Sequence, residues 1–133
     1  MLKRSCLALA AAVLSLVPSV PVLAQSTLSN QDVEYLGMLH WLLRQDKDYD
    51  FTLAINGLPN ETKVSLAKDF CEILRTGRTY DQMAQELFQP EYVAATAELN
   101  EYQRGATRKY IMAAWFVGVK NYCPEYDYQL RAD

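Results

Sequence analysis

Between residues 29 and 124 the chain repeats one pattern, in which apolar residues recur every three or four positions. This spacing is typical of helices that have one apolar face. The first stripe follows Ser29 and Asp32, which are spaced to form a capping box at the start of a helix. His40 lies off this stripe and has no partner nearby in the sequence. The apolar members of the stripe are Tyr35, Leu36, Met38, Leu39, Leu42 and Leu43.

Two more stretches carry the same helical spacing. The first follows Asn60, which can act as its cap, and ends at Gly77, a residue that favours a left-handed helix stop. A shorter helix is predicted over 80–87, where Thr79 and Gln82 repeat the capping-box pattern. The apolar stripe of the longer helix consists of Val64, Ala67, Phe70, Cys71 and Leu74.

The C-terminal third predicts one or two further helices. A single helix from Pro90 to Tyr122 would be about 50 Å long at 1.5 Å per residue. That length exceeds a compact domain of this size, so we expect a bend or break near Gly105. Ala114 and Gly118 would let another helix approach closely, and residues 125–133 read as a polar tail.

The fold class follows from these stretches together. Residues 44–60 carry a weak signal, and we expect a short helical turn at 51–55. No strand-like alternation persists over more than a few residues. The sequence therefore predicts an all-α domain, a small bundle of four to five helices.

The N-terminal segment has a different pattern. Lys3 and Arg4 precede an uncharged run dominated by Ala, Leu and Val, and Val22 and Ala24 suit cleavage after Ala24. The apolar run is too short to cross a bilayer as a stable helix. We therefore expect residues 1–24 to be a cleaved signal peptide and residues 25–133 to form one exported domain, periplasmic or secreted. No stable membrane insertion is expected after cleavage.

Charge narrows the range of partners. The chain has 13 basic and 16 acidic residues, and the expected cleavage removes only Lys3 and Arg4 from these. The mature domain is therefore more acidic than the precursor, whose net charge is −3. An acidic surface repels phosphate backbones and anionic lipids, so neither nucleic acid nor a membrane surface is an expected partner.

Cleavage leaves two cysteines, Cys71 and Cys123. In an oxidising compartment they permit only one internal pairing. Both lie on apolar stripes, so a disulfide would join the second long helix to the last. A metal site is the alternative, but it would need more ligands, and His40 is not near either cysteine in the sequence.

The sequence carries no motif of a known chemistry. No Gly-x-Ser-x-Gly elbow or phosphate-binding glycine loop is present. Asp46, Asp48 and Asp50 resemble the opening of a calcium loop, but Phe51 and Gly57 occupy the positions that require Gly and Glu. We expect no enzyme activity, no metal and no cofactor.

Several aromatic residues are not required by the apolar stripes. Trp41, Tyr110, Tyr126 and Tyr128 have rings with a polar group, which suit a binding surface. The alternative is that they cover the edges of a small core.

Two cysteine motifs carry a family resemblance. Phe70-Cys71-x-x-Leu74-x-x-Gly77 and Tyr122-Cys123-Pro124 resemble the small exported helical proteins of the domain of unknown function 732 family. The resemblance covers 66–87 and 107–124, whereas segments 44–63 and 88–106 are longer than the family pattern. It implies a Cys71–Cys123 disulfide and an α-helical fold, and the family has no assigned reaction to transfer.

The expected function is that of a non-enzymatic exported module. It would bind an unknown protein or small ligand through a helical groove or an aromatic patch. The alternative is a periplasmic chaperone of the acid-stress type, since such proteins are also small, helical and held by one disulfide. Its many carboxylates would then supply the pH trigger.

Overall fold

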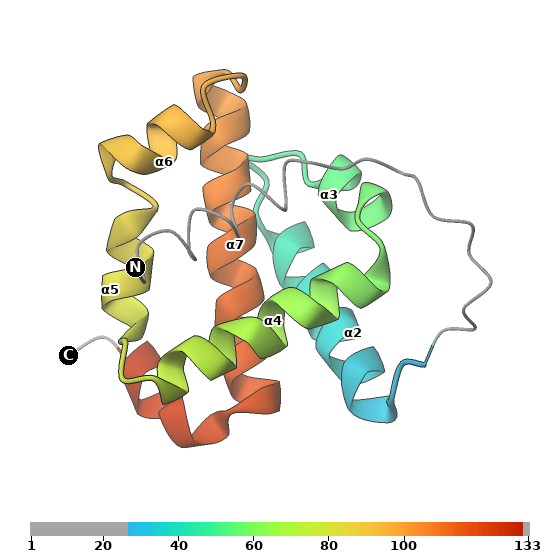
Figure 1. Cartoon of the computed structure of the whole chain (residues 1–133). Coiled ribbons are helices and arrows are strands. Elements are labelled where there is room, and N and C mark those ends of the chain that lie inside the picture. The colour runs from blue at the N-terminus through green and yellow to red at the C-terminus, as the bar shows by residue number, and fades with distance from the viewer. Residues whose placement is uncertain (1–26, 132–133) are drawn as a thin grey trace.

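A computed structural model describes residues 27–131, and all of the regular structure in that range is helical. The signal peptide predicted for residues 1–24 lies outside the described residues. Within these residues, six α-helices and one 3₁₀-helix follow one another (Figure 1). Their bounds are α2 Asn30–Gln45, α3 Thr52–Gly57, α4 Asn60–Arg75, α5 Tyr80–Glu86, α6 Pro90–Ala95, α7 Glu101–Tyr122 and η1 Pro124–Leu130. The predicted all-α fold is confirmed, with more short helices than expected.

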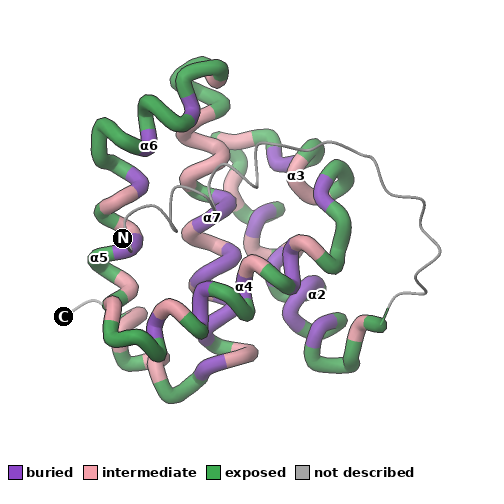
Figure 2. The backbone as a smooth tube through the Cα atoms, viewed as in Figure 1, coloured by how far each residue is buried: buried purple, intermediate pink, exposed green. Residues whose placement is uncertain are grey.

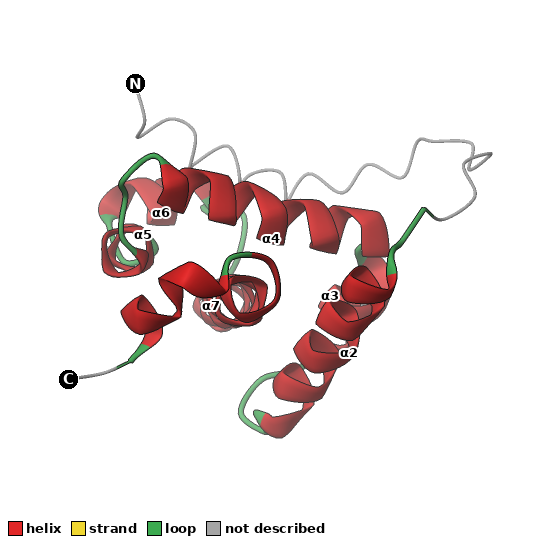
Figure 3. Cartoon of the chain, turned by 90° about the horizontal axis from the view of Figure 1, so that it is seen from below, coloured by secondary structure: helices red, strands yellow, loops and turns green. Residues whose placement is uncertain are grey.

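The longest helix, α7, is the centre of the bundle. α4 crosses one side of it, and α2 and η1 lie on opposite sides of it (Figure 3). Buried residues gather on the faces where α2, α4 and α7 meet (Figure 2). In the described part of the chain, no helix is long and apolar enough to cross a membrane.

The contact between α4 and α7 is close because its residues are flat or small. The rings of Phe70 and Trp115 stack with centroids 4.5 Å apart, and Tyr80 meets both rings edge-on. One turn further, a Cβ placed on Gly118 would lie 2.9 Å from the Cβ of Ala67. The prediction that Gly118 admits a neighbouring helix is therefore confirmed, and that helix is α4.

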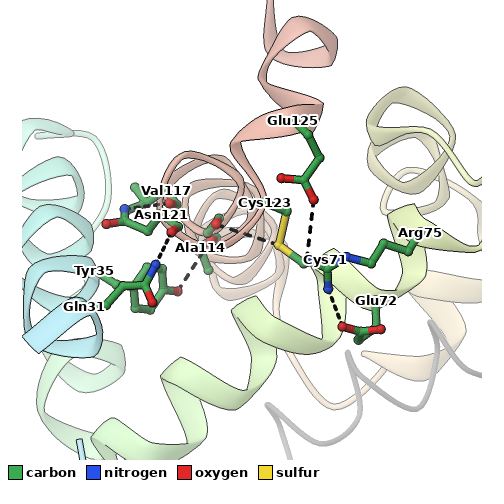
Figure 4. The surroundings of a disulfide bond; sticks show 11 residues. Gln31, Tyr35, Cys71, Glu72, Arg75, Ala114, Val117, Asn121, Cys123 and Glu125 are labelled. Carbon is green, nitrogen blue, oxygen red and sulfur yellow. Dashed lines mark hydrogen bonds and ion pairs between the residues drawn. A yellow bond between two sulfur atoms is a disulfide. The ribbon is translucent and has the colours of Figure 1, made fainter. Parts of the chain in front are cut away.

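The disulfide closes the same interface at its end. Cys71 on α4 bonds to Cys123 at the C-terminal end of α7, with the two Cα atoms 5.9 Å apart (Figure 4). Both cysteines are buried. Next to the bond, Arg75 forms ion pairs with Glu72 on its own helix and with Glu125 on η1. The predicted pairing is confirmed, and it ties α4, α7 and η1 together.

A buried carboxylate joins α2 to both of its neighbours. Asp32 accepts hydrogen bonds from the Ser29 backbone N–H and, at 2.7 Å, from the Tyr122 hydroxyl, and Lys68 lies 3.2 Å away. Burial alone would raise the pKa of Asp32. The hydrogen bonds from Ser29 and Tyr122 and the charge of Lys68 outweigh burial and lower this pKa to about 2.

The helix starts are mostly as predicted. The capping boxes at Ser29 and Thr79 are confirmed, and Gly77 has a φ of 98°, the left-handed conformation expected of it. The prediction for Asn60 is wrong, because Asn60 is the first residue of α4 and Pro59 precedes it without a side-chain cap.

The break expected near Gly105 is also wrong. α7 continues through Gly105 without interruption, and the chain leaves the helical path earlier, at 96–100. Asn100 caps α7 in a capping box with Gln103, and the Arg104 guanidinium donates to the Thr96 side chain and to the Leu99 carbonyl. These hydrogen bonds pair the polar groups of the turn between α6 and α7. The turn therefore forms without a glycine.

Two further expectations need correction. Met38, assigned to the buried stripe of α2, is half exposed, because α4 and α7 cover the face that carries Tyr35 and Leu39. The supposed polar tail after Pro124 is instead the helix η1, which packs against α7.

Candidate functional site

An open groove runs along the side of α7 that α4 does not cover. Its walls come from the end of α2 at 42–45, the loop at 46–51, Phe88 and residues 105–116 of α7. Its volume is about 980 Å³. We call it the α7 groove.

The floor of the α7 groove is mainly apolar and follows one face of the helix. Gly105, Lys109, Met112, Ala113 and Phe116 line it and recur at steps of three and four residues. At 1.5 Å per residue this face is roughly 17 Å long. Such a floor has the length of about three helical turns.

An ion pair fixes one wall of the groove. The Lys109 ammonium lies 2.9 Å from a carboxylate oxygen of Asp46, the first residue after α2. The hydrogen bond from Lys109, with a second from the Asp48 backbone N–H, holds the pKa of Asp46 below its usual range. The same contact raises the pKa of Lys109. The pair attaches the 46–51 loop to α7.

Tyr49 explains why a glycine lies within α7. A Cβ on Gly105 would lie only 3.0 Å from the Tyr49 hydroxyl oxygen, so the ring rests directly on the helix backbone. The rings of Phe51 and Tyr102 lie within 6.0 Å of the Tyr49 ring, centroid to centroid. In addition, the Asp50 backbone N–H donates to the Tyr102 hydroxyl. The sequence suggested a helix break at Gly105, whereas its role is to accommodate this loop.

The opposite wall carries an aromatic ring beside a cation. Phe88 is 61% exposed, and the Arg108 guanidinium lies 4.3 Å from the centre of its ring. Arg108 also donates from Nε to the Leu87 carbonyl, which holds the guanidinium in place. An exposed ring held by a cation–π contact is a preformed anchor for an apolar side chain.

The four aromatic residues selected from the sequence do not form one surface. Trp41, 57% exposed, lies on α2, whereas Tyr128, 65% exposed, and the half-buried Tyr126 lie on η1 across α7 (Figure 3). Tyr110 is only 2% exposed and is not a surface residue at all. The sequence gives no sign of the aromatic residues that line the α7 groove, including Tyr49, Phe88 and Phe116, because they come together from three separate segments of the chain.

His40 has a partner that the sequence did not indicate. Its Nε2 lies 3.0 Å from the ammonium of Lys63, and that ammonium also donates to the Ile55 carbonyl. Lys63 is only 1% exposed. Burial, followed by the positive charges of Lys63 and Arg44, lowers the pKa of His40. Burial likewise lowers the pKa of Lys63. The pair connects α2, α3 and α4.

The acidic loop is built as a series of turns. Asp46 accepts from the Asp48 backbone N–H at 3.0 Å, and Asp50 accepts from the Thr52 backbone N–H at 2.9 Å. These are the local hydrogen bonds by which aspartates stabilise turns. Within residues 27–131, no three His, Cys, Asp or Glu side chains are grouped so as to hold a metal ion.

Comparison with known proteins adds no relative. No protein-family model, curated protein or solved structure matches the chain.

Proposed function

We propose that the chain is an exported, non-enzymatic binding module that holds an amphipathic helical segment of a partner protein in the α7 groove. One observation carries the proposal: a mainly apolar floor three helical turns long lies open between a fixed loop and the exposed ring of Phe88. Grooves of this kind receive helices whose apolar residues recur at three- and four-residue steps.

The groove floor fits the apolar face of such a helix. Met112, Ala113 and Phe116 are each half buried and accessible from the groove. Ala113 is the smallest of the three, so it leaves room for a large apolar side chain of the partner. Phe88 would then cover that side chain from the rim.

The charges at the rim favour a partner that carries a carboxylate. Asp46 is already paired with Lys109, so its charge is largely neutralised. Arg108 lies on the groove wall between Phe88 and the floor. A carboxylate on the partner helix could approach its guanidinium without disturbing the ion pair.

Export is the part of the proposal that rests on the disulfide and the N-terminal sequence. Disulfides persist in oxidising compartments and are rare in the cytosol, which agrees with a signal peptide at residues 1–24. We further propose membership of the domain of unknown function 732 family, on the basis of the motifs Phe70-Cys71-x-x-Leu74-x-x-Gly77 and Tyr122-Cys123-Pro124.

Selection from a displayed library of helical peptides tests the groove. We expect the exported chain to enrich peptides with apolar residues at steps of three and four. The Ala113→Gln variant places a longer, helix-favouring side chain on the floor and should weaken binding of those peptides by at least about tenfold. Isothermal titration calorimetry measures the affinities.

The matched control is Ala94→Gln, the same change at an exposed position of α6 outside the groove. It should bind the selected peptides as the unchanged chain does. Equal binding by both variants, or a library that yields no enriched helical pattern, would overturn the proposal.

A further inference from the structure

A second, smaller pocket lies between α3 and the N-terminal half of α7. Leu53, Ala54 and Leu58 line it from α3 and the residue after it, and Leu99 and Ala106 line it from the other side. Its volume is about 280 Å³, which suits a small molecule rather than a protein segment. It shares Phe51 with the α7 groove, and the rest of its lining is different.

One residue of this lining, Tyr110, has an unsatisfied polar group. Its side chain is buried, and its hydroxyl makes no hydrogen bond to any atom of the described chain. Buried hydroxyls nearly always have a partner, because leaving one without a partner destabilises the fold. Each such exception therefore calls for an explanation.

Other tyrosines in the core show how unusual this is. The buried Tyr35 and Tyr92 donate to the Ala114 and Arg104 carbonyls, and the partly buried Tyr80 donates to the Met112 carbonyl. Each of these hydroxyls is satisfied by a helix backbone. Of the tyrosines buried in residues 27–131, Tyr110 alone has an unpaired hydroxyl, and it is the one that lines the pocket.

The charge of the lining limits what could bind there. Asp50 is the only charged residue among those that line the pocket, and it is an anion. Gln103 and Thr107 add uncharged polar groups. With no cation to receive a carboxylate or phosphate, the site disfavours anions. Burial raises the pKa of Tyr110, so its hydroxyl remains a neutral donor.

We propose that this pocket binds a small, neutral, mainly apolar molecule with one hydrogen-bond acceptor, and that the Tyr110 hydroxyl donates to that acceptor. The apolar walls from α3 and α7 would cover the body of the ligand. A ketone, an ester or an alcohol of about ten to seventeen heavy atoms has the required size and polarity. The site is separate from the α7 groove and does not depend on the function proposed for it.

Prodan, a neutral naphthalene ketone dye, is a suitable probe. We expect its fluorescence to reveal one saturable site on the exported chain. Tyr110→Phe removes the hydroxyl and keeps the ring. It should weaken binding about five- to tenfold, which is the affinity that one neutral hydrogen bond contributes. The ketone emission should also shift to the blue in this variant, because the hydrogen bond to it is lost.

A second variant tests the pocket itself. Ala106→Leu fills the lining from α7 and should abolish saturable binding, with circular dichroism used to verify the fold. Ala113→Gln, in the α7 groove, should bind Prodan as the unchanged chain does. The anionic dye anilinonaphthalene sulfonate should not bind in this pocket, so Ala106→Leu should leave any binding of that dye unchanged. Unchanged Prodan binding by either Tyr110→Phe or Ala106→Leu, or loss of it in Ala113→Gln, would overturn the proposal.

Discussion

Gly118 is where the absence of a side chain lets α4 and α7 meet. An added Cβ would lie 2.9 Å from the Ala67 Cβ and 3.4 Å from the Ala67 Cα. Both atoms belong to a helix that the disulfide holds in place, so neither can move far. The usual gain from replacing glycine in a helix is therefore opposed by overlap with a rigid neighbour.

Gly118→Ala should accordingly lower the free energy of unfolding, by about 1–3 kcal/mol, the range for overpacked cores. The control is Gly37→Ala on α2, where a Cβ would have no atom within 4 Å. That change should instead stabilise by roughly 0.5–1 kcal/mol through helix propensity. Urea denaturation of both variants measures the two effects, and a stabilised Gly118→Ala would contradict the α4–α7 contact.

His40 offers a titration that reports on the buried Lys63. Because burial and Lys63 lower its pKa below the ordinary 6.5, the unfolded chain takes up the proton first as the pH falls. The stability associated with neutral His40 is thus present above pH 6.5 and is lost as the pH falls from there through the lowered pKa.

The NMR titration is simple because His40 is the only histidine in the chain. We expect a pKa below 6.5 that rises in Lys63→Met, since the neighbouring positive charge is removed. Arg44→Met, which removes a weaker influence on the same ring, should raise it less. A pKa at or above 6.5 in the unchanged chain would mean that the His40–Lys63 contact is absent in solution.

At the scale of elements, some helix caps could be predicted from the sequence and one could not. Ser29 and Thr79 were identifiable because a capping box is a local pattern of four residues. Asn100 forms the same motif with Gln103, but the sequence also contains Gly105, a residue that commonly interrupts helices, and α7 in fact begins at the capping box. Gly105 is required by Tyr49, a residue 56 positions earlier in the chain, and such a contact leaves no local signal.

Two asparagines near helix starts therefore differ in their roles. Asn100→Ala should lower the free energy of unfolding by about 0.5–2 kcal/mol, because the Gln103 backbone N–H loses its partner. Asn60→Ala should change it far less, since Asn60 is the first residue of α4 and not its N-cap. Thermal unfolding followed by circular dichroism compares the two, and equal losses would contradict the assignment of the caps.

The candidate site was less predictable than the helices, because it also depends on contacts between residues far apart in the sequence. Lys109 and Asp46 form an ion pair across 63 residues, and Phe88 meets Arg108 only because the chain turns between α6 and α7. Each residue is ordinary within its own segment. The sequence therefore indicated a groove or an aromatic patch in general terms, and the aromatic residues it singled out, such as Trp41, lie elsewhere.

For the whole molecule, the disulfide is the main covalent constraint. It links cysteines 52 residues apart, and closing such a loop stabilises by about 4 kcal/mol in the chain-entropy model. Its position was predictable because cleavage after Ala24 would leave only two cysteines, both on apolar stripes. At the same interface, the stacked rings of Phe70 and Trp115 form a noncovalent contact between the two helices.

Replacing both Cys71 and Cys123 with Ser should therefore cost roughly 2–5 kcal/mol of stability while preserving most of the helix content. Chemical denaturation and far-ultraviolet circular dichroism measure the two quantities. Dithiothreitol should destabilise the unchanged chain by a similar amount and leave the double variant unaffected. Two titratable thiols in the purified chain would show that the bond does not form.

Photocrosslinking in cells that produce the chain tests the proposed function most directly. Benzoylphenylalanine in place of Gln45, at the rim of the α7 groove, should crosslink to an amphipathic helical segment of a partner, identified by mass spectrometry. The crosslink should disappear when Ala113→Gln is added, and the same probe in place of Val33, on the outer face of α2, should give none. A crosslink that persists in Ala113→Gln, or that forms equally well from position 33, would contradict the account.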